Sequence, residues 1–178
     1  MNFYKNQQGS AALEFALVAP VFFAIVLGII ELSLTYLASI SIEHGVQETA
    51  RLIRTGQIQV SQNPQAEFRA QLCGNMPVLI QCDSRLYVDV RQATNFASVN
   101  LQPPQPDGNG NLSAPRDSNG NPIPPQFDPG GPSSIVVVRV YYNYPVLMPG
   151  MSDFLINTSS NDRLIMATSA FRNERYRT

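Results

Sequence analysis

The feature that most constrains this chain is a long apolar run near its amino terminus. No residue from Phe15 to Ile30 is charged, Glu31 interrupts the run, and Leu32 to Ile42 is again free of charge. A hydrocarbon layer about 30 Å thick needs about 20 apolar residues in a helix. We therefore predict a membrane span over about residues 15–37, with Glu31 near the far interface or paired. Pro20 lies inside this span and is expected to kink the helix without ending it.

The helical pattern continues beyond the membrane span. Four apolar residues follow at steps of four, four and three: Ile42, Val46, Ala50 and Ile53. That spacing is typical of one face of a helix, and Gly56 favours its end. The simplest prediction is one helix over residues 10–56, apolar first and amphipathic later. A cleaved secretory signal fits less well, because its apolar region is only about 7–15 residues long.

Residues 57–178 predict a globular domain of the α+β class. A short helix is expected after Asn63, with Pro64 in its first turn, Phe68 and Leu72 on one face, and Gly74 at its end. Residues 85–91 alternate as a half-buried strand, with three side chains inward (Leu86, Val88 and Val90) and two outward (Tyr87 and Asp89). A further short strand is predicted over Phe96–Leu101.

The strongest strand pattern and a final predicted strand lie near the carboxyl terminus. Residues 135–146 place Val136, Val138, Val140 and Tyr142 on one face and end at Pro145. Residues 163–171 are expected to pair with them in the antiparallel sense. The predicted fold is thus a three- or four-stranded antiparallel sheet packed on the amphipathic half of the long helix.

A segment rich in proline, glycine and asparagine, residues 103–134, is predicted to be a long flexible loop. It contains DGNGN (107–111) and DSNGN (117–121), whose oxygen-rich side chains make weak candidates for calcium: Asp107, Asn109, Asp117 and Asn119. A calcium-binding loop of the EF-hand type wants glycine at its sixth position, where this chain has Leu112 and Pro122. We favour two Asn-Gly turns and predict no metal site.

Charge and composition exclude several function classes. Charged residues make up only 14% of the chain and its net charge is −1, so it lacks the basic footprint of a nucleic-acid-binding protein. The single histidine, His44, has no nucleophile motif near it, and no glycine-rich phosphate loop follows a predicted strand. We therefore expect neither an enzyme nor a cofactor. Cys73 and Cys82 are read as a disulfide if this part of the chain is exported, and otherwise as two buried thiols.

The entrance to the apolar run has a distinctive order of residues. The sequence G-S-A-A-L-E-F, from Gly9 to Phe15, resembles the cleavage signature of type IV prepilins and pseudopilins. In that class a prepilin peptidase cuts after a glycine, and a glutamate stands at the fifth mature position. The cut would fall between Gly9 and Ser10, with Glu14 as the fifth residue. A proline at Pro20 and the GIIE sequence of residues 28–31 are especially similar to the TadE-like branch of the Flp/Tad pilus systems.

The similarity is close over about residues 9–32 and returns more loosely at 170–176. There A-F-R-N-E-R-Y is similar to a terminal Arg-Asn-Glu motif of that family, although Arg175 stands where the family pattern has proline. The resemblance implies a leader over residues 1–9 and roles for Glu14, Phe15 and Pro20 in helix recognition and assembly. After cleavage, the new ammonium group of one subunit would lie near the Glu14 carboxylate of another.

The resemblance also implies a location and a function. The amino terminus would be cytoplasmic, the helix would cross the inner membrane once, and residues 57–178 would be periplasmic, with the pilus as an extracellular destination. That orientation favours the disulfide between Cys73 and Cys82. The expected partners are the prepilin peptidase, other pilins or pseudopilins and Tad assembly proteins. Because major pilins of this type are usually much shorter, we predict a minor pilin or pseudopilin. The alternative is an uncleaved single-pass membrane protein whose exported domain binds a partner.

Overall fold

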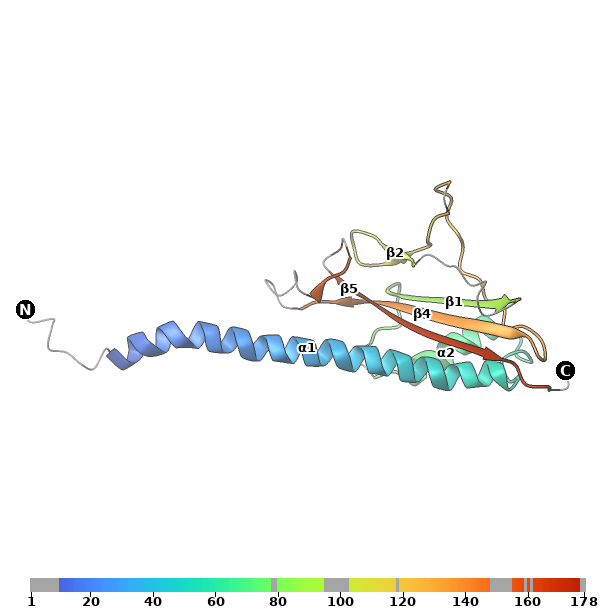
Figure 1. Cartoon of the computed structure of the whole chain (residues 1–178), viewed down its shortest axis with the longest axis horizontal. Helices are drawn as coiled ribbons and strands as arrows, with labels where there is room; N and C mark the ends of the chain where they lie inside the picture. Colours follow the sequence, from blue (N-terminus) through green and yellow to red (C-terminus); the bar gives the residue numbers. More distant parts are fainter. Residues whose placement is uncertain are drawn as a thin grey trace, which may run out of the picture.

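The computed structural model shows one long helix whose second half supports a small antiparallel sheet. It describes residues 10–77, 80–94, 103–117, 119–147, 155–158, 160 and 162–176. The elements in chain order are α1 (Ser10–Arg54), α2 (Pro64–Gly74), β1 (Leu86–Ala93), β2 (Gln105–Pro106), β3 (Leu112–Ser113), β4 (Ile135–Pro145) and β5 (Asp162–Arg172). The globular domain formed by the described part of residues 57–178 is called the head below. Figure 1 shows the first half of α1 extending alone from the head toward the amino terminus. The predicted α+β class is confirmed.

The sheet has the strand order β1-β4-β5, and both pairings are antiparallel. Val140 of β4 lies opposite Val88 of β1 and Ala167 of β5. The face of β4 predicted to be apolar is buried over the helices, with Val136, Val138, Val140 and Tyr142 each at most 2% exposed. The strand expected over Phe96–Leu101 lies outside the described residues.

The expectation of a half-buried β1 is wrong on its outer face. Tyr87 and Asp89 do point away from the α1 side, yet they are only 9% and 3% exposed. A second layer covers them, because the backbone N–H of Gln126 donates to Asp89 Oδ1 (3.1 Å) and residues 126–128 pair with β1 at Val90. The alternating pattern correctly identified the strand but could not reveal a layer formed by a distant segment.

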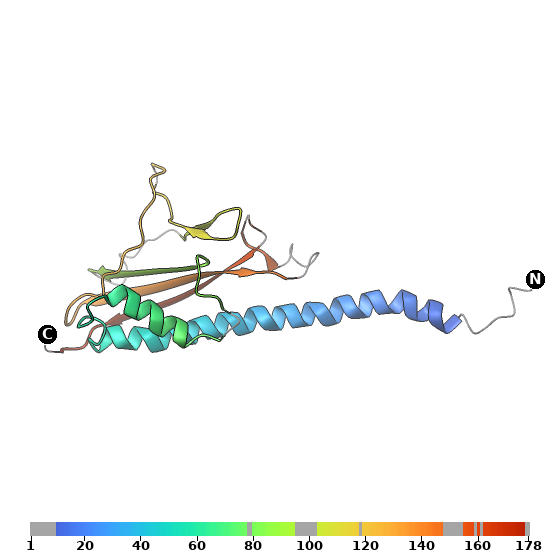
Figure 2. The same ribbon diagram turned by 180° about the vertical axis from the view of Figure 1, so that it is seen from behind.

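That second layer comes from residues 103–134, which the sequence suggested were a flexible loop. The described part of this segment contains the β2–β3 hairpin, and Leu112 N–H donates to the carbonyl of Ser84 (3.0 Å). In Figures 1 and 2 the hairpin lies on the side of the sheet opposite α1. The head therefore has three layers: helices, sheet and hairpin segment.

Helix α2 follows its sequence signals closely. The Asn63 side chain accepts the N–H of Ala66 (3.2 Å) as an N-cap, and Pro64 occupies the first turn. Phe68 and Leu72 are both fully buried against the core. Helix α1 likewise ends at Arg54, shortly before Gly56, whose φ of 82° is the left-handed conformation expected after a helix end.

Candidate functional site

The amino-terminal half of α1 is the region with the most distinctive chemistry. Eleven large apolar side chains between Leu13 and Ile30 are 44–70% exposed. By length and composition, α1 is also apolar enough to cross a membrane. Exposed apolar side chains on every side of a helix are unfavourable in water and favourable in lipid. This half of α1 therefore has the properties of a membrane span.

The predicted cleavage and recognition residues lie at the start of this span. Gly9 is outside the described residues, and α1 begins at Ser10. Glu14 and Phe15 lie in its first turns, where both are exposed. The first described residue of the helix is thus the one that would follow the predicted cut.

Pro20 lies within a continuous helix, in agreement with the sequence prediction. Together with the small residues Ala24 and Gly28, one turn apart, it leaves a shallow apolar hollow on the helix surface. Small residues at a spacing of four allow close approach of a second helix in a membrane. This part of α1 therefore permits the close approach of a second helix.

Glu31 is the point at which the head meets the helix. Its side chain is only 2% exposed, and its Oε1 accepts the backbone N–H of Leu147 (3.2 Å), just after β4. Tyr144 lies close by: burial raises the pKa of its hydroxyl, and the charge of Glu31 adds to that effect. The sequence predicted an interfacial or paired Glu31, and the structure supplies a backbone partner from the head.

From Glu31 onward, one side of α1 is buried. Apart from the adjacent pair Thr49 and Ala50, the buried side chains recur at steps of three and four: Glu31, Thr35, Ala38, Ile42, Val46, Thr49, Ala50 and Ile53. The four apolar positions predicted from the sequence all belong to this set. Glu31 and Thr35 extend the buried side two turns toward the membrane half, and sequence reasoning missed that extension because both residues are polar.

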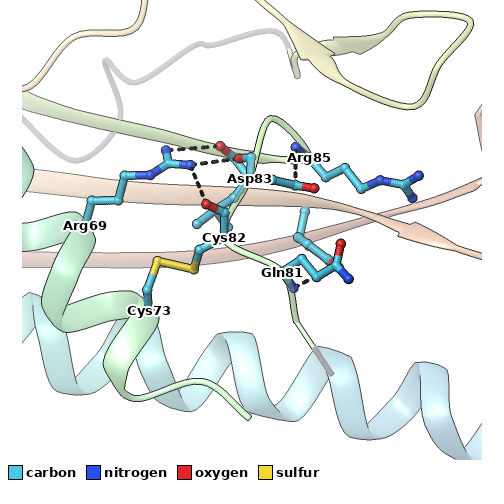
Figure 3. Close-up of a disulfide and its surroundings, with 8 residues drawn as sticks. Arg69, Cys73, Gln81, Cys82, Asp83 and Arg85 are labelled. Carbon is cyan, nitrogen blue, oxygen red and sulfur yellow. Dashed lines mark hydrogen bonds between the residues drawn. A yellow bond between two sulfur atoms is a disulfide. The ribbon is translucent and has the colours of Figure 1, made fainter. Parts of the chain in front are cut away.

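The cysteine pair predicted from the sequence lies in the head. The structure joins Cys73, at the end of α2, to Cys82 in a disulfide that ties α2 to the chain leading into β1 (Figure 3). Arg69, one turn earlier in α2, donates to the carbonyl oxygens of Cys82 (3.3 Å) and Asp83 (2.7 Å). A covalent bond and a guanidinium thus hold the same loop.

The carboxyl-terminal Arg-Asn-Glu residues return to the end of α1. Glu174 donates its N–H to the carbonyl of Arg54 (2.9 Å), and its carboxylate lies 3.1 Å from the Arg54 guanidinium. Asn173 is 4% exposed and donates to the carbonyls of Pro129 (2.9 Å) and Gly131 (3.0 Å). This motif therefore fastens the head to the helix at the end far from the membrane half.

The two Asp-Asn-Gly sequences form nearly identical turns. In each, Oδ1 of the aspartate (Asp107 or Asp117) accepts two backbone N–H groups at 2.8 Å, from the residues two and four positions later. The bonded Asn111 side chain lowers the pKa of Asp107, and the backbone N–H of Asn121 lowers that of Asp117. Within the described residues no group of three or more metal-ligating His, Cys, Asp or Glu side chains is found. The predicted turns are confirmed.

Comparison with known families matches residues 9–51 to the model described as TadE-like protein. The match begins at the predicted cleavage position and ends within α1, so it includes the exposed half and most of the head-bearing half. No curated protein and no solved structure matches the chain. The resemblance seen in the sequence is confirmed over residues 9–51, which are similar to the TadE-like family.

Proposed function

We propose that this chain is a minor pilin or pseudopilin of a Flp/Tad-type pilus system, with a structural rather than an enzymatic role. The observation that carries the proposal is one continuous helix with two different surroundings. Its first half exposes apolar side chains on all sides, its second half carries the head, and the TadE-like match covers both. Such a helix can be stored in a membrane and later packed against helices of other subunits.

In the stored form we place the hydrocarbon span at residues 11–30 rather than at the predicted 15–37, because the buried Glu31 already contacts the head. Twenty helical residues are about 30 Å long, which equals the usual thickness of the hydrocarbon layer. The buried Glu31 follows directly, so the head begins at the far interface. With a cytoplasmic amino terminus the head is periplasmic, an oxidising compartment in which the Cys73–Cys82 disulfide is stable.

In the assembled form, the prepilin peptidase has removed the leader after Gly9. The new ammonium group at Ser10 pairs with the Glu14 carboxylate of a neighbouring subunit, which offsets part of the cost of burying both charges. The hollow at Pro20, Ala24 and Gly28 receives the neighbouring helix. The large head favours a minor or accessory position over that of the major pilin.

Cleavage is tested by intact mass and amino-terminal sequencing of the protein from its native membrane, with and without the prepilin peptidase. We expect a mature chain that starts at Ser10 only when the peptidase is present, and no cleavage of Gly9→Ala. Gly74→Ala is the matched control, because a Cβ added at Gly74 would meet no atom within 4 Å. It should be cleaved normally.

An intact Met1 terminus in both strains would contradict the proposal. The uncleaved single-pass membrane protein with a partner-binding head would then take its place. Assembly needs a separate measurement, the amount of this chain in purified pili. Gly28→Leu fills the hollow and should lower that amount, whereas Val18→Leu enlarges an exposed side chain outside the hollow and should not.

A further inference from the structure

The two Asp-Asn-Gly turns are nearly identical in themselves but lie in different surroundings. Each places an asparagine directly before a glycine at positive φ: Asn109 before Gly110 (81°) and Asn119 before Gly120 (83°). Neither turn lies within residues 9–51, which match the TadE-like family. The same chemistry can therefore be compared at two places in one chain.

An Asn-Gly sequence carries the groups needed for its own modification. The backbone nitrogen of the glycine can attack Cγ of the asparagine, because glycine has no Cβ to hinder the approach. The bond from Cγ to Nδ2 breaks, and ammonia leaves with the proton of the glycine N–H. Water then opens the five-membered imide and leaves aspartate or isoaspartate. The reaction consumes one water molecule and needs no oxidant, reductant or enzyme.

The closed form of each turn prevents this attack. The N–H of Gly120 donates to the carbonyl of Asp117 (3.0 Å), and the N–H of Gly110 donates to the carbonyl of Asp107 (3.1 Å). In both turns the asparagine N–H also donates to Oδ1 of the aspartate at 2.8 Å. The attacking nitrogen becomes free only when the turn opens, so the free energy of local opening governs the rate.

The turn at residues 107–111 is fixed to the sheet. Gly110 is buried, and its carbonyl accepts the side-chain N–H of Asn143, a residue of β4 with no exposed surface (2.8 Å). A Cβ added at Gly110 would lie only 2.6 Å from Oδ2 of Asp162 in β5. Opening this turn therefore breaks a buried hydrogen bond in addition to the bonds of the turn itself.

The turn at residues 117–121 lacks such support. Asn119 and Gly120 are exposed, and a Cβ added at Gly120 would meet no atom within 4 Å. Among the described residues, the hydrogen bonds of this turn stay within the same segment, including the bond from the exposed Arg116 guanidinium to the Gly120 carbonyl (2.8 Å). In Figures 1 and 2 this gold segment projects away from the sheet on the side opposite α1. Its opening therefore breaks only bonds that water can replace.

From this contrast we infer that Asn119 is a site of spontaneous deamidation, and that docking on the sheet protects Asn109. The product adds one carboxylate to the projecting turn of a chain whose net charge is −1. Isoaspartate also places one extra carbon atom in the backbone of the turn. The inference goes beyond the proposed function, because it requires neither the membrane span nor leader cleavage nor pilus assembly.

The test ages the full chain in dodecyl maltoside micelles at mildly alkaline pH. Samples taken over time are digested with trypsin, which cuts after lysine and arginine and so separates residues 92–116 from residues 117–139. Mass spectrometry with fragmentation identifies the deamidated asparagine in each peptide. We expect Asn119 to deamidate about tenfold faster than Asn109, the factor that corresponds to one additional buried hydrogen bond. In urea the two rates should become similar, because neither turn persists.

Two variants loosen the docked turn. Asn143→Ala removes the donor to the Gly110 carbonyl, and Ser84→Ala removes a hydroxyl that is hydrogen-bonded to the Asn111 side chain. Asn143→Ala should accelerate deamidation of Asn109 about tenfold and Ser84→Ala by a smaller factor, with no change at Asn119. Ser84 is exposed, so its variant keeps the test informative if Asn143→Ala unfolds the head. A thermal melt of each variant in the same micelles checks that the head is folded.

A matched pair of variants assigns the new charge to one asparagine. Asn119→Gln moves the side-chain amide one methylene further from the Gly120 nitrogen and should remove most of the acidic product seen on isoelectric focusing. Asn109→Gln makes the same change in the docked turn and should leave the amount of acidic product unchanged.

Faster deamidation at Asn119 in the folded chain, similar rates in urea and acceleration at Asn109 in the folded Asn143→Ala variant would support the inference. Equal rates at the two asparagines in the folded chain, or a faster rate at Asn109, would overturn it. Deamidation of Asn119 only in urea would overturn it as well, because the projecting turn would then protect itself. An unchanged rate at Asn109 in both folded variants would overturn the role of docking. None of these results depends on where the amino terminus is cleaved.

Discussion

The two halves of α1 form one continuous helix but have opposite surroundings. Phe22, in the first half, is 57% exposed, whereas Ile42, in the second half, is completely buried by the head. Both halves belong to the same α-helix, so the difference lies in what surrounds their side chains. The first half is suited to lipid on all sides, and the second half is suited to lipid or water on one side and to protein on the other.

The boundary between the halves is marked by polar residues. Glu31 and Thr35 are the first two buried positions of the head-bearing half, at 2% and 5% exposure. The Thr35 hydroxyl donates to the Glu31 carbonyl (2.9 Å), while the Glu31 carboxylate accepts Leu147 N–H from the head. Hydropathy alone therefore does not locate where the membrane span ends and the head begins.

The largest expected effect comes from placing the same charge in each half. Val46→Asp buries an unpaired carboxylate at a completely buried position and should destabilise the head by about 4 kcal/mol or more. Val18→Asp lies at a position that is 65% exposed and should leave the head's melting temperature in micelles unchanged. Its cost should appear in membrane insertion, at roughly 2.5–3.5 kcal/mol.

Tyrosine circular dichroism during heating measures the first effect, and the fraction of chain extracted by alkaline carbonate measures the second. A Val18→Asp variant with an equally unstable head would contradict the division of α1 into two halves. So would a Val46→Asp variant that melts at the normal temperature.

The sequence predicted much more of the helix and sheet than of the segment that covers the sheet. Helix α1 and the burial of Ile42 follow from a spacing of three and four, and β4 follows from four alternating side chains. Such patterns arise where the side chains on one face of a helix or strand are buried against neighbouring elements. The second layer over Asp89 could not be predicted in this way, because Gln126 belongs to a proline-rich segment whose backbone, not its apolar side chains, makes the contact.

For the candidate site, the sequence singles out residues whose roles stay predictions. Glu14 and Pro20 stand out in the sequence because a charge and a proline are unusual at a membrane span. The partner of Glu31 was not predictable, because it is a backbone N–H at Leu147, 116 residues away. A backbone donor has no sequence signal of its own.

Removing the disulfide should affect only the head. Replacing both Cys73 and Cys82 by serine should lower the free energy of unfolding of the head by roughly 2–3 kcal/mol, because the unfolded chain gains the entropy of an open loop. Urea unfolding in micelles, followed by tyrosine circular dichroism, measures this loss. Amide exchange in residues 11–30 should stay unchanged, and faster exchange there would show that the two halves of α1 are coupled.

A smaller effect is expected at the boundary itself. Glu31→Ala removes the acceptor of the Leu147 N–H. The loss should lower the free energy of unfolding of the head by about 1–3 kcal/mol. Hydrogen exchange should accelerate at Leu147 and remain slow at Asn143, whose N–H donates to the Arg85 carbonyl instead. Glu43→Ala, at an exposed position of the same helix, is the control. Unchanged exchange at Leu147 in Glu31→Ala would mean that this hydrogen bond does not hold the head at the membrane end.

The smallest effect should come from the opposite end of the head-bearing half. Arg54 and Glu174 form an ion pair at 3.1 Å, and both side chains are 52% exposed, so water screens their attraction. Glu174→Gln should lower the free energy of unfolding, measured in urea, by less than about 1 kcal/mol, and this loss should become smaller as salt is added. The backbone bond from Glu174 N–H to the Arg54 carbonyl remains in this variant. A salt-independent loss of several kcal/mol in the free energy of unfolding would show that the charge of Glu174 holds the head to the helix. The Glu31–Leu147 hydrogen bond would then not be the stronger of the two contacts between α1 and the head.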